Sequence, residues 1–334
     1  MRSENRRYEV ILLDTRLSIK RYVVLLLLVL PVQLEAIAET AVEPISSFVT
    51  LGTGAGGVPL AERAQASNYL RYGDDEILID VGDGASRQLA RIGVPLRSID
   101  AVFLSHLHFD HTGGLFAFLA LRVQTNVTNK VTIFGPQGTK DSVDGLLAAM
   151  FSVDSRTSAL KPNARASTAN IEVVELTDRF QATIGKIEVS AVINSHYVLS
   201  TDPKDKARSF SFRFSMPDRS IVYTGDTGPS EAVENLAKGV DVLVTEMLDP
   251  EELLATIKTN NPDIPPAALE YAKNHFIYQH LTPDEVGQMA GNAAAKSLIV
   301  THNALKDESL AQAGRKIAKY YSGSVVFAHD LQSF

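Results

Sequence analysis

The residues best suited to chemistry lie in segment 105–114, which reads SHLHFDHTGG. His106 and His108 are two positions apart, so both side chains can point to one side where a strand ends. Asp110 and His111 come one turn later and can face a second metal ion about 3.5–4 Å from the first. Imidazole and carboxylate ligands suit zinc, iron or manganese. Because four ionisable groups this close would make a poor core without metal or mutual hydrogen bonds, the segment predicts a metal site.

Three further candidate ligands each follow an apolar run with the composition of a strand. His196 comes after INS at the end of one run, Asp226 follows VYTG, and His302 follows LIVT. Any one of them alone would more often be an ordinary surface or loop residue. Their recurrence behind three separate strand-like runs favours a shared role as metal ligands.

The elements that must position these ligands are short strand-like runs that alternate with helical patterns from residue 45 onward. Branched and aromatic residues between Gly or Asp turns indicate strands at 47–51, 67–72, 76–81, 100–104, 131–134, 171–176, 187–193, 210–214, 221–223, 240–244, 297–300 and 324–327. Helices are expected at 85–92, after 114, and at 138–151, 229–237, 250–257, 266–274, 283–294 and 308–321, with a loop over 152–170. Since no linker or repeat divides this body, one domain of two packed sheets flanked by helices is expected.

Together, these motifs and elements resemble the metallo-β-lactamase superfamily from about residue 47 onward. The resemblance implies an α/β fold, a four-layer αββα sandwich of two mixed β-sheets flanked by helices, within a hydrolase domain over 39–334. It also implies two divalent metal ions, with Zn²⁺ as the first choice and Mn²⁺ or Fe²⁺ as alternatives. The implied ligands are His106, His108 and His196 for the first ion and Asp110, His111 and His302 for the second, with Asp226 bridging both.

Two of these positions favour a hydrolase within the superfamily. The chain contains no cysteine, so the β-lactamases that place a cysteine at the position of Asp226 are excluded, and the others lack this bridging carboxylate. His108 stands where the related diiron oxygen-reducing proteins carry glutamate. The resemblance therefore implies a dinuclear metal-dependent hydrolase.

Two more segments are similar to the ribonuclease Z and arylsulfatase-like branch of the superfamily. The Gly-rich turn at 51–57, LGTGAGG, matches the branch's N-terminal turn, although an ordinary turn between strands would look the same. The segment 280–287, HLTPDEVG, places Thr282 before a proline, which predicts a helix N-cap. The resemblance implies that His280, two residues earlier, acts on the leaving group. His275 and His329 are predicted to be structural or exposed.

This residue set suggests hydrolysis of a sulfate ester or a phosphate (di)ester. Two metal ions would lower the pKa of a bridging water so that hydroxide exists near neutral pH. Asp110 would orient the nucleophile as well as bind metal, and a protonated His280 would donate a proton to the departing oxygen. A lactone or thioester hydrolase of the acyl-lactone type remains an alternative. A ribonuclease Z-type endoribonuclease and a non-catalytic metal-binding protein are weaker alternatives.

The first 38 residues have the pattern of a signal peptide. Arg16, Lys20 and Arg21 precede the apolar run 22–30, and Ala36 and Ala38 have the spacing of a cleavage site. The run is too short for a membrane span, which takes about 20 residues. Export, most simply to the periplasm, is therefore predicted, with no stable membrane insertion after cleavage.

Charge and chain length bear on the partner of the exported protein. Removal of the six basic and four acidic residues of the signal would change the net charge from −7 to −9. Only 29 residues separate His196 from Asp226, which leaves little room for the RNA-gripping arm of ribonuclease Z. A small-molecule ester is therefore the expected substrate and no nucleic acid is expected, while a homodimer is compatible with the sequence. Segment 247–279 is expected to be helical, either as a roof over the metal site or as a remote packing excursion.

Overall fold

The structure is a computed structural model that describes residues 45–56, 58–157, 168–200 and 207–334. The predicted signal peptide and its boundary at residue 38 lie outside the described residues. Within the described part of the chain, none of the helices combines the length and the apolar character that a membrane crossing requires.

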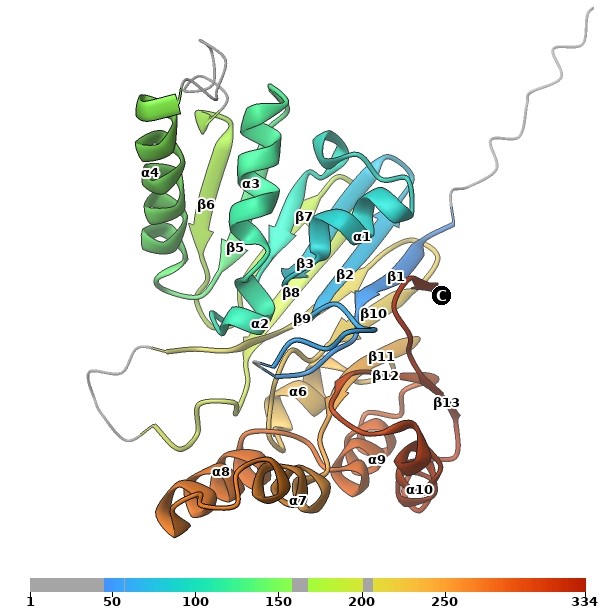
Figure 1. Cartoon of the computed structure of the whole chain (residues 1–334). Coiled ribbons are helices and arrows are strands. Elements are labelled where there is room, and N and C mark those ends of the chain that lie inside the picture. Colours follow the sequence, from blue (N-terminus) through green and yellow to red (C-terminus); the bar gives the residue numbers. More distant parts are fainter. Residues whose placement is uncertain (1–44, 57, 158–167, 201–206) are drawn as a thin grey trace, which may run out of the picture. The chain divides into compact units, whose positions relative to one another are not determined.

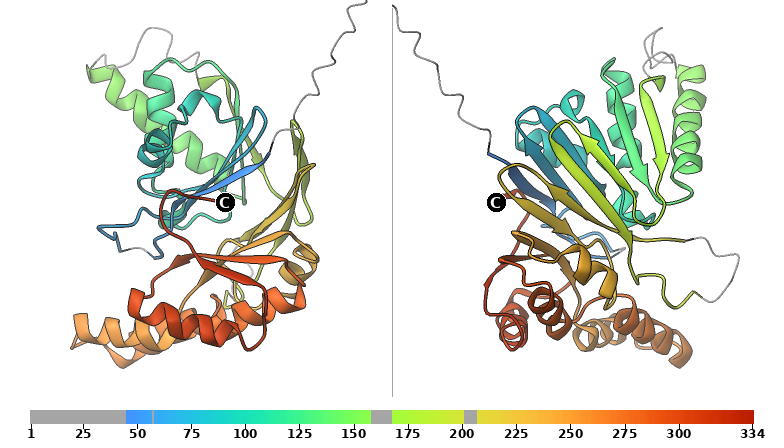
Figure 2. Two further views of the ribbon diagram at one scale, coloured as in Figure 1. Left: turned by 90° about the vertical axis from the view of Figure 1, so that its right-hand side faces the viewer. Right: turned by 180° about the vertical axis from the view of Figure 1, so that it is seen from behind.

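Two mixed sheets form the centre of the fold, and Figures 1 and 2 show them packed face to face. The first sheet has the order β14-β1-β2-β3-β4-β5-β6. Its strands are β1 Ser47–Gly52, β2 Ser67–Tyr72, β3 Asp75–Val81, β4 Ala101–Phe103, β5 Val131–Gly135, β6 Ile171–Glu175 and β14 Gln332–Ser333. The pairs from β14 to β3 are antiparallel and those from β3 to β6 are parallel.

The second sheet has the order β13-β12-β11-β10-β9-β8-β7. Its strands are β7 Gln181–Ile184, β8 Ile187–Ile193, β9 Phe210–Ser215, β10 Ser220–Tyr223, β11 Val242–Met247, β12 Ser297–Asn303 and β13 Ser324–Phe327. The pairs from β7 to β10 are antiparallel and those from β10 to β13 are parallel. As a result β8, β10, β11 and β12 all run in the same direction.

Helices cover the outer face of each sheet, which completes the predicted four-layer αββα sandwich (Figure 2). The first sheet carries α1 Ala85–Arg91, α3 Leu115–Gln124 and α4 Thr139–Thr157, with the short η1 Leu96–Ser98 and α2 Phe109–Thr112 in its loops. The second sheet carries α6 Glu231–Leu236, α9 Pro283–Asn292 and α10 Asp307–Ile317, beside the helix pair α7 Pro250–Asn260 and α8 Pro266–Tyr278.

Three apolar cores separate these four layers. Side chains alternate across a strand, so Ile77 and Ile79 of β3 enter the core between the sheets, whereas Leu78 packs under the helices of the first sheet. A third core joins the second sheet to its helices, as Leu243 of β11 and Val286 of α9 illustrate. Central strands such as β11 are therefore buried along their whole length, as parallel strands covered on both faces must be.

The observed elements differ from the predicted ones in a few places. The expected loop over 152–170 is wrong at its start, because α4 continues to Thr157. Val143 and Met150, one heptad apart, pack this helix against the first sheet. Because helix formation is cooperative, the helix continues past Met150. The short edge strands β7 and β14 were not predicted. Thr282 caps α9 in a capping box with Glu285, as predicted.

Candidate metal centre

The seven predicted ligands lie where the carboxyl ends of strands from both sheets meet. His106 and His108 follow β4 of the first sheet, and Asp110 and His111 lie in α2. The second sheet supplies the rest, because β8, β10 and β12 run in the same direction and end at one edge. These ligands are His196 after β8, Asp226 after β10 and His302 within β12.

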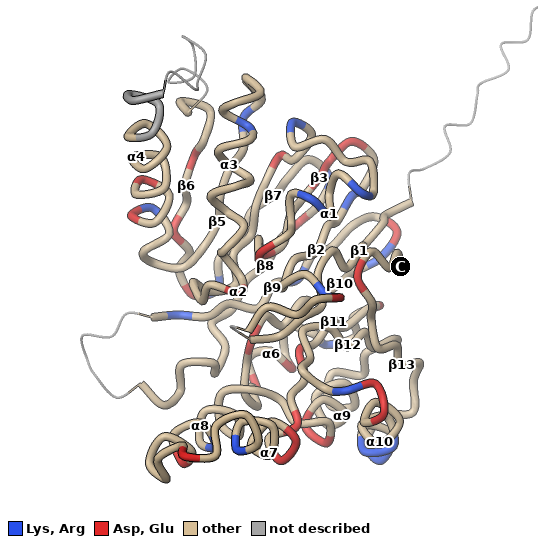
Figure 3. Tube along the Cα trace, in the orientation of Figure 1, with Lys and Arg blue, Asp and Glu red and all other residues tan. Residues whose placement is uncertain are grey.

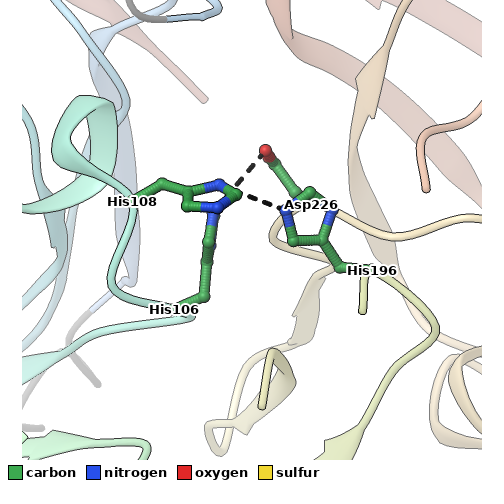
Figure 4. A group of neighbouring side chains, drawn as sticks. All are labelled: His106, His108, His196 and Asp226. Carbon is green, nitrogen blue, oxygen red and sulfur yellow. Dashed lines mark hydrogen bonds and ion pairs between the residues drawn. The ribbon is translucent and has the colours of Figure 1, made fainter. Parts of the chain in front are cut away.

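Four of the seven residues form a first cluster, and Figure 4 shows their side chains converging from the two sheets. The donor atoms of His106, His108, His196 and Asp226 all lie within 4.8 Å of one another. His196 Nε2 is 3.3 Å from His108 Nδ1, and His106 Nε2 is 3.8 Å from Asp226 Oδ2. Two imidazoles on one tetrahedral zinc, at zinc–nitrogen distances near 2.0–2.1 Å, have their nitrogens about 3.3 Å apart. The spacing of His108 and His196 therefore fits a metal ion.

The other three residues form a second cluster that shares Asp226 with the first. His111 Nε2 lies 3.3 Å from His302 Nε2, and the two atoms lie 3.8 and 3.6 Å from Asp110 Oδ2. Asp226 Oδ1 is 3.3 Å from His111 Nε2 and 3.2 Å from His302 Nε2. Since its other oxygen faces the first cluster, Asp226 has the geometry of a bridging carboxylate.

Buried polar atoms without a partner indicate that this arrangement accommodates cations. His106 Nε2 and Asp226 Oδ1 are buried and accept or donate no hydrogen bond among the described residues. Such atoms are costly unless a ligand satisfies them. Burial lowers the pKa of His106 well below its usual value and that of His196 to about 3, so both rings are neutral at pH 7. Neutral imidazoles are the form that binds metal, so these two rings suit divalent cations. Despite burial, the carboxylates of Asp226 and Asp80 instead raise the pKa of His111 well above its usual value.

Asp80, which the sequence analysis missed, orients one of these imidazoles from behind. It is fully buried at the end of β3 and has a left-handed backbone with φ 56°. His111 Nδ1 lies 2.8 Å from Asp80 Oδ2, which also accepts hydrogen bonds from the hydroxyls of Ser105 and Tyr223. The carboxylate therefore holds the proton of His111 on Nδ1 and leaves Nε2 free for a metal. A signal was present in the sequence, because Asp80 interrupts the apolar run ILIDV.

The Gly-rich turn also supports the centre, through its backbone. The amide of Gly56 donates to Asp110 Oδ2 at 3.1 Å, and the carbonyl of Gly54 lies 3.1 Å from His302 Nδ1. His302 itself has φ 42°, a conformation that costs energy and occurs at functional sites. A side chain at Gly52 would lie 2.0 Å from a backbone oxygen, so the close approach of this turn requires glycine.

His280 and Glu246 form a buried pair beside the first cluster. His280 Nδ1 is 2.7 Å from Glu246 Oε2, and Glu246 Oε1 accepts the amide proton of Thr227. Burial lowers the pKa of His280 and raises that of Glu246 well above its usual value. The pair therefore holds a proton between the two side chains. His280, Glu246 and Asp226 form a third group whose donor atoms are close enough to hold a metal ion. The 2.7 Å hydrogen bond already satisfies His280 Nδ1 and Glu246 Oε2.

The sequence predicts His275 to be structural or exposed and does not single out Glu246. His275 is half-buried at the C-terminal end of α8, and its Nε2 lies 3.3 Å from His280 Nε2. Its ring centroid is 6.0 Å from that of His196. His275 lies there because the chain reverses direction between α7 and α8, so that the end of α8 comes back to the site. Segment 247–279 is thus helical as expected, and one end of it borders the metal centre. His329 is exposed, as predicted.

Comparisons with known proteins agree with this fold. Residues 75–303 match the family described as the β-lactamase superfamily domain. Ribonuclease Z from Mycobacterium sp. (strain KMS) is 30% identical over 254 residues, which cover 75% of this chain and 82% of the relative.

Solved structures share the fold at lower identity. The metallo-β-lactamase fold protein YhfI from Bacillus subtilis has a TM-score of 0.61 at 18% identity, over 86% of this chain and 98% of its own. A diphosphatase from the PhnP family has a TM-score of 0.58 at 17% identity, over 86% and 96%. Zn²⁺-bound PqqB from Methylobacterium extorquens has 0.57 at 16%, over 86% and 99%. The chain therefore belongs to the β-lactamase superfamily, as a hydrolase with the metallo-β-lactamase fold.

Proposed function

We propose that this protein hydrolyses a small phosphate diester or sulfate ester with two divalent metal ions, most simply Zn²⁺. His106, His108 and His196 would hold one ion, Asp110, His111 and His302 the other, and Asp226 both. When bound, such ions lower the pKa of a water molecule and offset the negative charge of the transition state. Asp110, whose Oδ2 is held by the amide of Gly56, is in place to orient the attacking oxygen.

The observation that carries the proposal is the position of His280. Its Nδ1 is held by Glu246, so its Nε2, which lies 3.3 Å from His275 Nε2, is the atom that would face a departing oxygen. The proton that the pair holds can then pass through the ring as the ester bond breaks. His280 would be the catalytic acid, and Glu246 a positioning residue that acts through it.

Two observations support a small ester over RNA. Strands β9 and β10 occupy part of the 29-residue span between His196 and Asp226, where an RNA-binding arm would have to be inserted. The net charge of −7 predicts no attraction to a polyanion. The names of the ribonuclease Z relative and of the PhnP-family diphosphatase support phosphate chemistry. The acyl-lactone alternative differs in that its carbonyl chemistry would be indifferent to His280→Ala. Export through residues 1–38 stays part of the proposal and predicts a shortened N-terminus in the mature protein.

A series of esters with leaving alcohols of increasing pKa tests the role of His280. For the zinc-loaded protein, His280→Ala should lower kcat about 100-fold or more for a poorly activated alcohol and much less for a nitrophenol, which departs without a proton. Glu246→Gln should show the same trend more weakly. The matched control is His329→Ala, which removes an exposed imidazole.

If His280→Ala lowered kcat equally for all leaving groups, His280 would not be the catalytic acid. Asp110→Ala should abolish every metal-dependent turnover. Cleavage of an acyl lactone alone, indifferent to His280→Ala, would replace the proposal with the lactone alternative.

A further inference from the structure

The metal centre opens to solvent beside α2. His106, His111 and His196 are fully buried, whereas His108 is partly exposed. Between His108 and Asp110 stands Phe109, whose side chain is 85% exposed. Phe109 is therefore an exposed apolar side chain next to the partly exposed ligand His108.

A second apolar segment borders the same opening. The ring of Tyr197 packs against His196 and His108, at centroid distances of 4.8 and 5.5 Å. The two residues that follow it, Val198 and Leu199, are 58% and 41% exposed. This segment thus presents apolar side chains next to ligands of the first cluster.

Helix α8 forms a third border. Tyr271, His275 and Tyr278 have the spacing i, i+4 and i+7, which places them on one helix face. His275 contacts His280, so this face is directed toward the centre, and Tyr271 lies about 6 Å further along the helix axis. Tyr271 and Tyr278 are 76% and 52% exposed, and no residue of α8 is fully buried. These tyrosines therefore do not pack into an apolar core.

Most of the large apolar side chains that the described residues expose lie in segments that flank this one opening. Beyond the segments above, Val58 and Leu60 belong to the loop that continues the Gly-rich turn. Isolated exposed apolar residues are normal, but their concentration around a site marks a binding surface. The flanking segments carry no cationic excess, since their charged residues are Glu62, Arg63, Asp110, Glu270 and Lys273. Figure 3 likewise shows Lys and Arg spread over several helices instead of gathered in a band.

We infer that an apolar rim, defined as Phe109, Val198, Leu199, Tyr271 and Tyr278, binds an aryl or alkyl group of the substrate. This inference rests on the proposed function and specifies its substrate class. The metal centre would take the phosphate or sulfate, and the rim would take the hydrophobic alcohol esterified to it. A polyanionic chain such as RNA would meet no excess of positive charge among the described residues of these segments.

A series of alkylphosphonates from methyl to octyl, measured by calorimetry on the zinc-loaded full chain, tests the rim without turnover. Affinity should rise about two- to fourfold per methylene until the rim is covered, since each buried methylene favours binding. The binding heat capacity should become more negative along the series. Tyr271→Ser and Phe109→Ser should reduce the increment per methylene, whereas Tyr320→Ser, a matched exposed tyrosine on another part of the surface, should not.

The outcomes separate the rim from the proposed function. Two results would contradict binding at the rim. One is equal affinity along the series, and the other is an affinity gain per methylene that both rim variants retain. Failure of the protein to hydrolyse any ester, combined with a rising series, would instead contradict the hydrolase proposal and keep the rim. Both rim variants change exposed side chains, and circular dichroism checks that they fold.

Discussion

At the scale of single residues, the site contains side chains that would face the metal ions. It also contains groups that hold these side chains in place. Asp80 belongs to the second kind, because its carboxylate points away from the centre and accepts the Nδ1 proton of His111. The imidazoles of His196 and His302 are held in the same way by the carbonyls of Gln279 and Gly54. In each case a hydrogen bond on Nδ1 leaves Nε2 toward the centre, which is how proteins select the ligand tautomer.

Asp80→Asn tests this orientation. The amide has the shape of the carboxylate, but its NH₂ group cannot accept the Nδ1 proton of His111, so the ring shifts its proton to Nε2 or turns. We expect the affinity of the second metal position to fall about 10–100-fold. Competition with a chromophoric chelator measures this fall.

The matched control for Asp80 is Asp218→Asn, which changes an exposed aspartate in a turn of the second sheet. This variant should bind metal like the unchanged protein. Wild-type metal affinity in Asp80→Asn, with unchanged circular dichroism, would show that the hydrogen bond does not set the tautomer.

At the scale of elements, the second sheet brings its ligands together because β8, β10 and β12, which carry them, run in one direction. At the opposite, amino-terminal end, Asp241, which immediately precedes β11, connects the starts of β10 and β12. Its carboxylate accepts hydrogen bonds from the amide and hydroxyl of Ser220, where β10 begins, and from Lys296, just before β12. The hydrogen bond from Lys296, with those from Ser220, lowers the pKa of Asp241 to about 2.

Asp241→Asn should therefore destabilise the fold in a pH-dependent way. A lowered carboxyl pKa contributes stability above the unfolded value of about 3.9, and this contribution is lost as pH falls toward 2. Because Asp241 is partly exposed, we expect a loss of about 1 kcal/mol at pH 6. Such a loss is about 2–4 °C in Tm for a chain of this size.

Thermal unfolding of Asp241→Asn and the unchanged protein from pH 7 to pH 3 measures this effect. The difference in Tm should be constant above pH 5 and shrink below pH 4. The control Asp263→Asn, in the turn between α7 and α8, should match the unchanged protein throughout. A difference that grew toward low pH would contradict the assigned sign.

At the scale of the whole molecule, the candidate metal centre joins the two sheets. The ligands between His106 and His111 belong to the first sheet, and His196, Asp226 and His302 belong to the second. Ions bound there would link the sheets at one edge, whereas the core of side chains such as Phe103 and Phe212 links them elsewhere. Ligands that bind only the folded state stabilise it by mass action.

Addition of zinc to chelator-treated protein should therefore raise Tm. An excess of 100-fold over Kd contributes about 2.7 kcal/mol, or about 5–10 °C. Differential scanning calorimetry measures the shift. His302→Ala should reduce it, whereas His329→Ala should leave it unchanged. A full shift in His302→Ala would place the stabilising metal outside this centre.

The amino-acid sequence by itself determined the fold class, the strand and helix order and the set of seven candidate ligands. These features depend on local patterns, such as the apolar run before Asp226 or the spacing of His106 and His108, and local patterns are visible in one chain. The proline and threonine that start α9 were readable for the same reason.

Only the tertiary structure decided which groups stand behind and around the ligands. Asp80 and Glu246 lie inside strand runs, and their partners His111 and His280 are 31 and 34 positions away. His275 reaches the site because α7 and α8 fold back as a pair. The spacing of residues in the sequence does not indicate this arrangement. Contacts between distant segments arise from the packing of the sheets and helices, so they become visible only once the chain is folded.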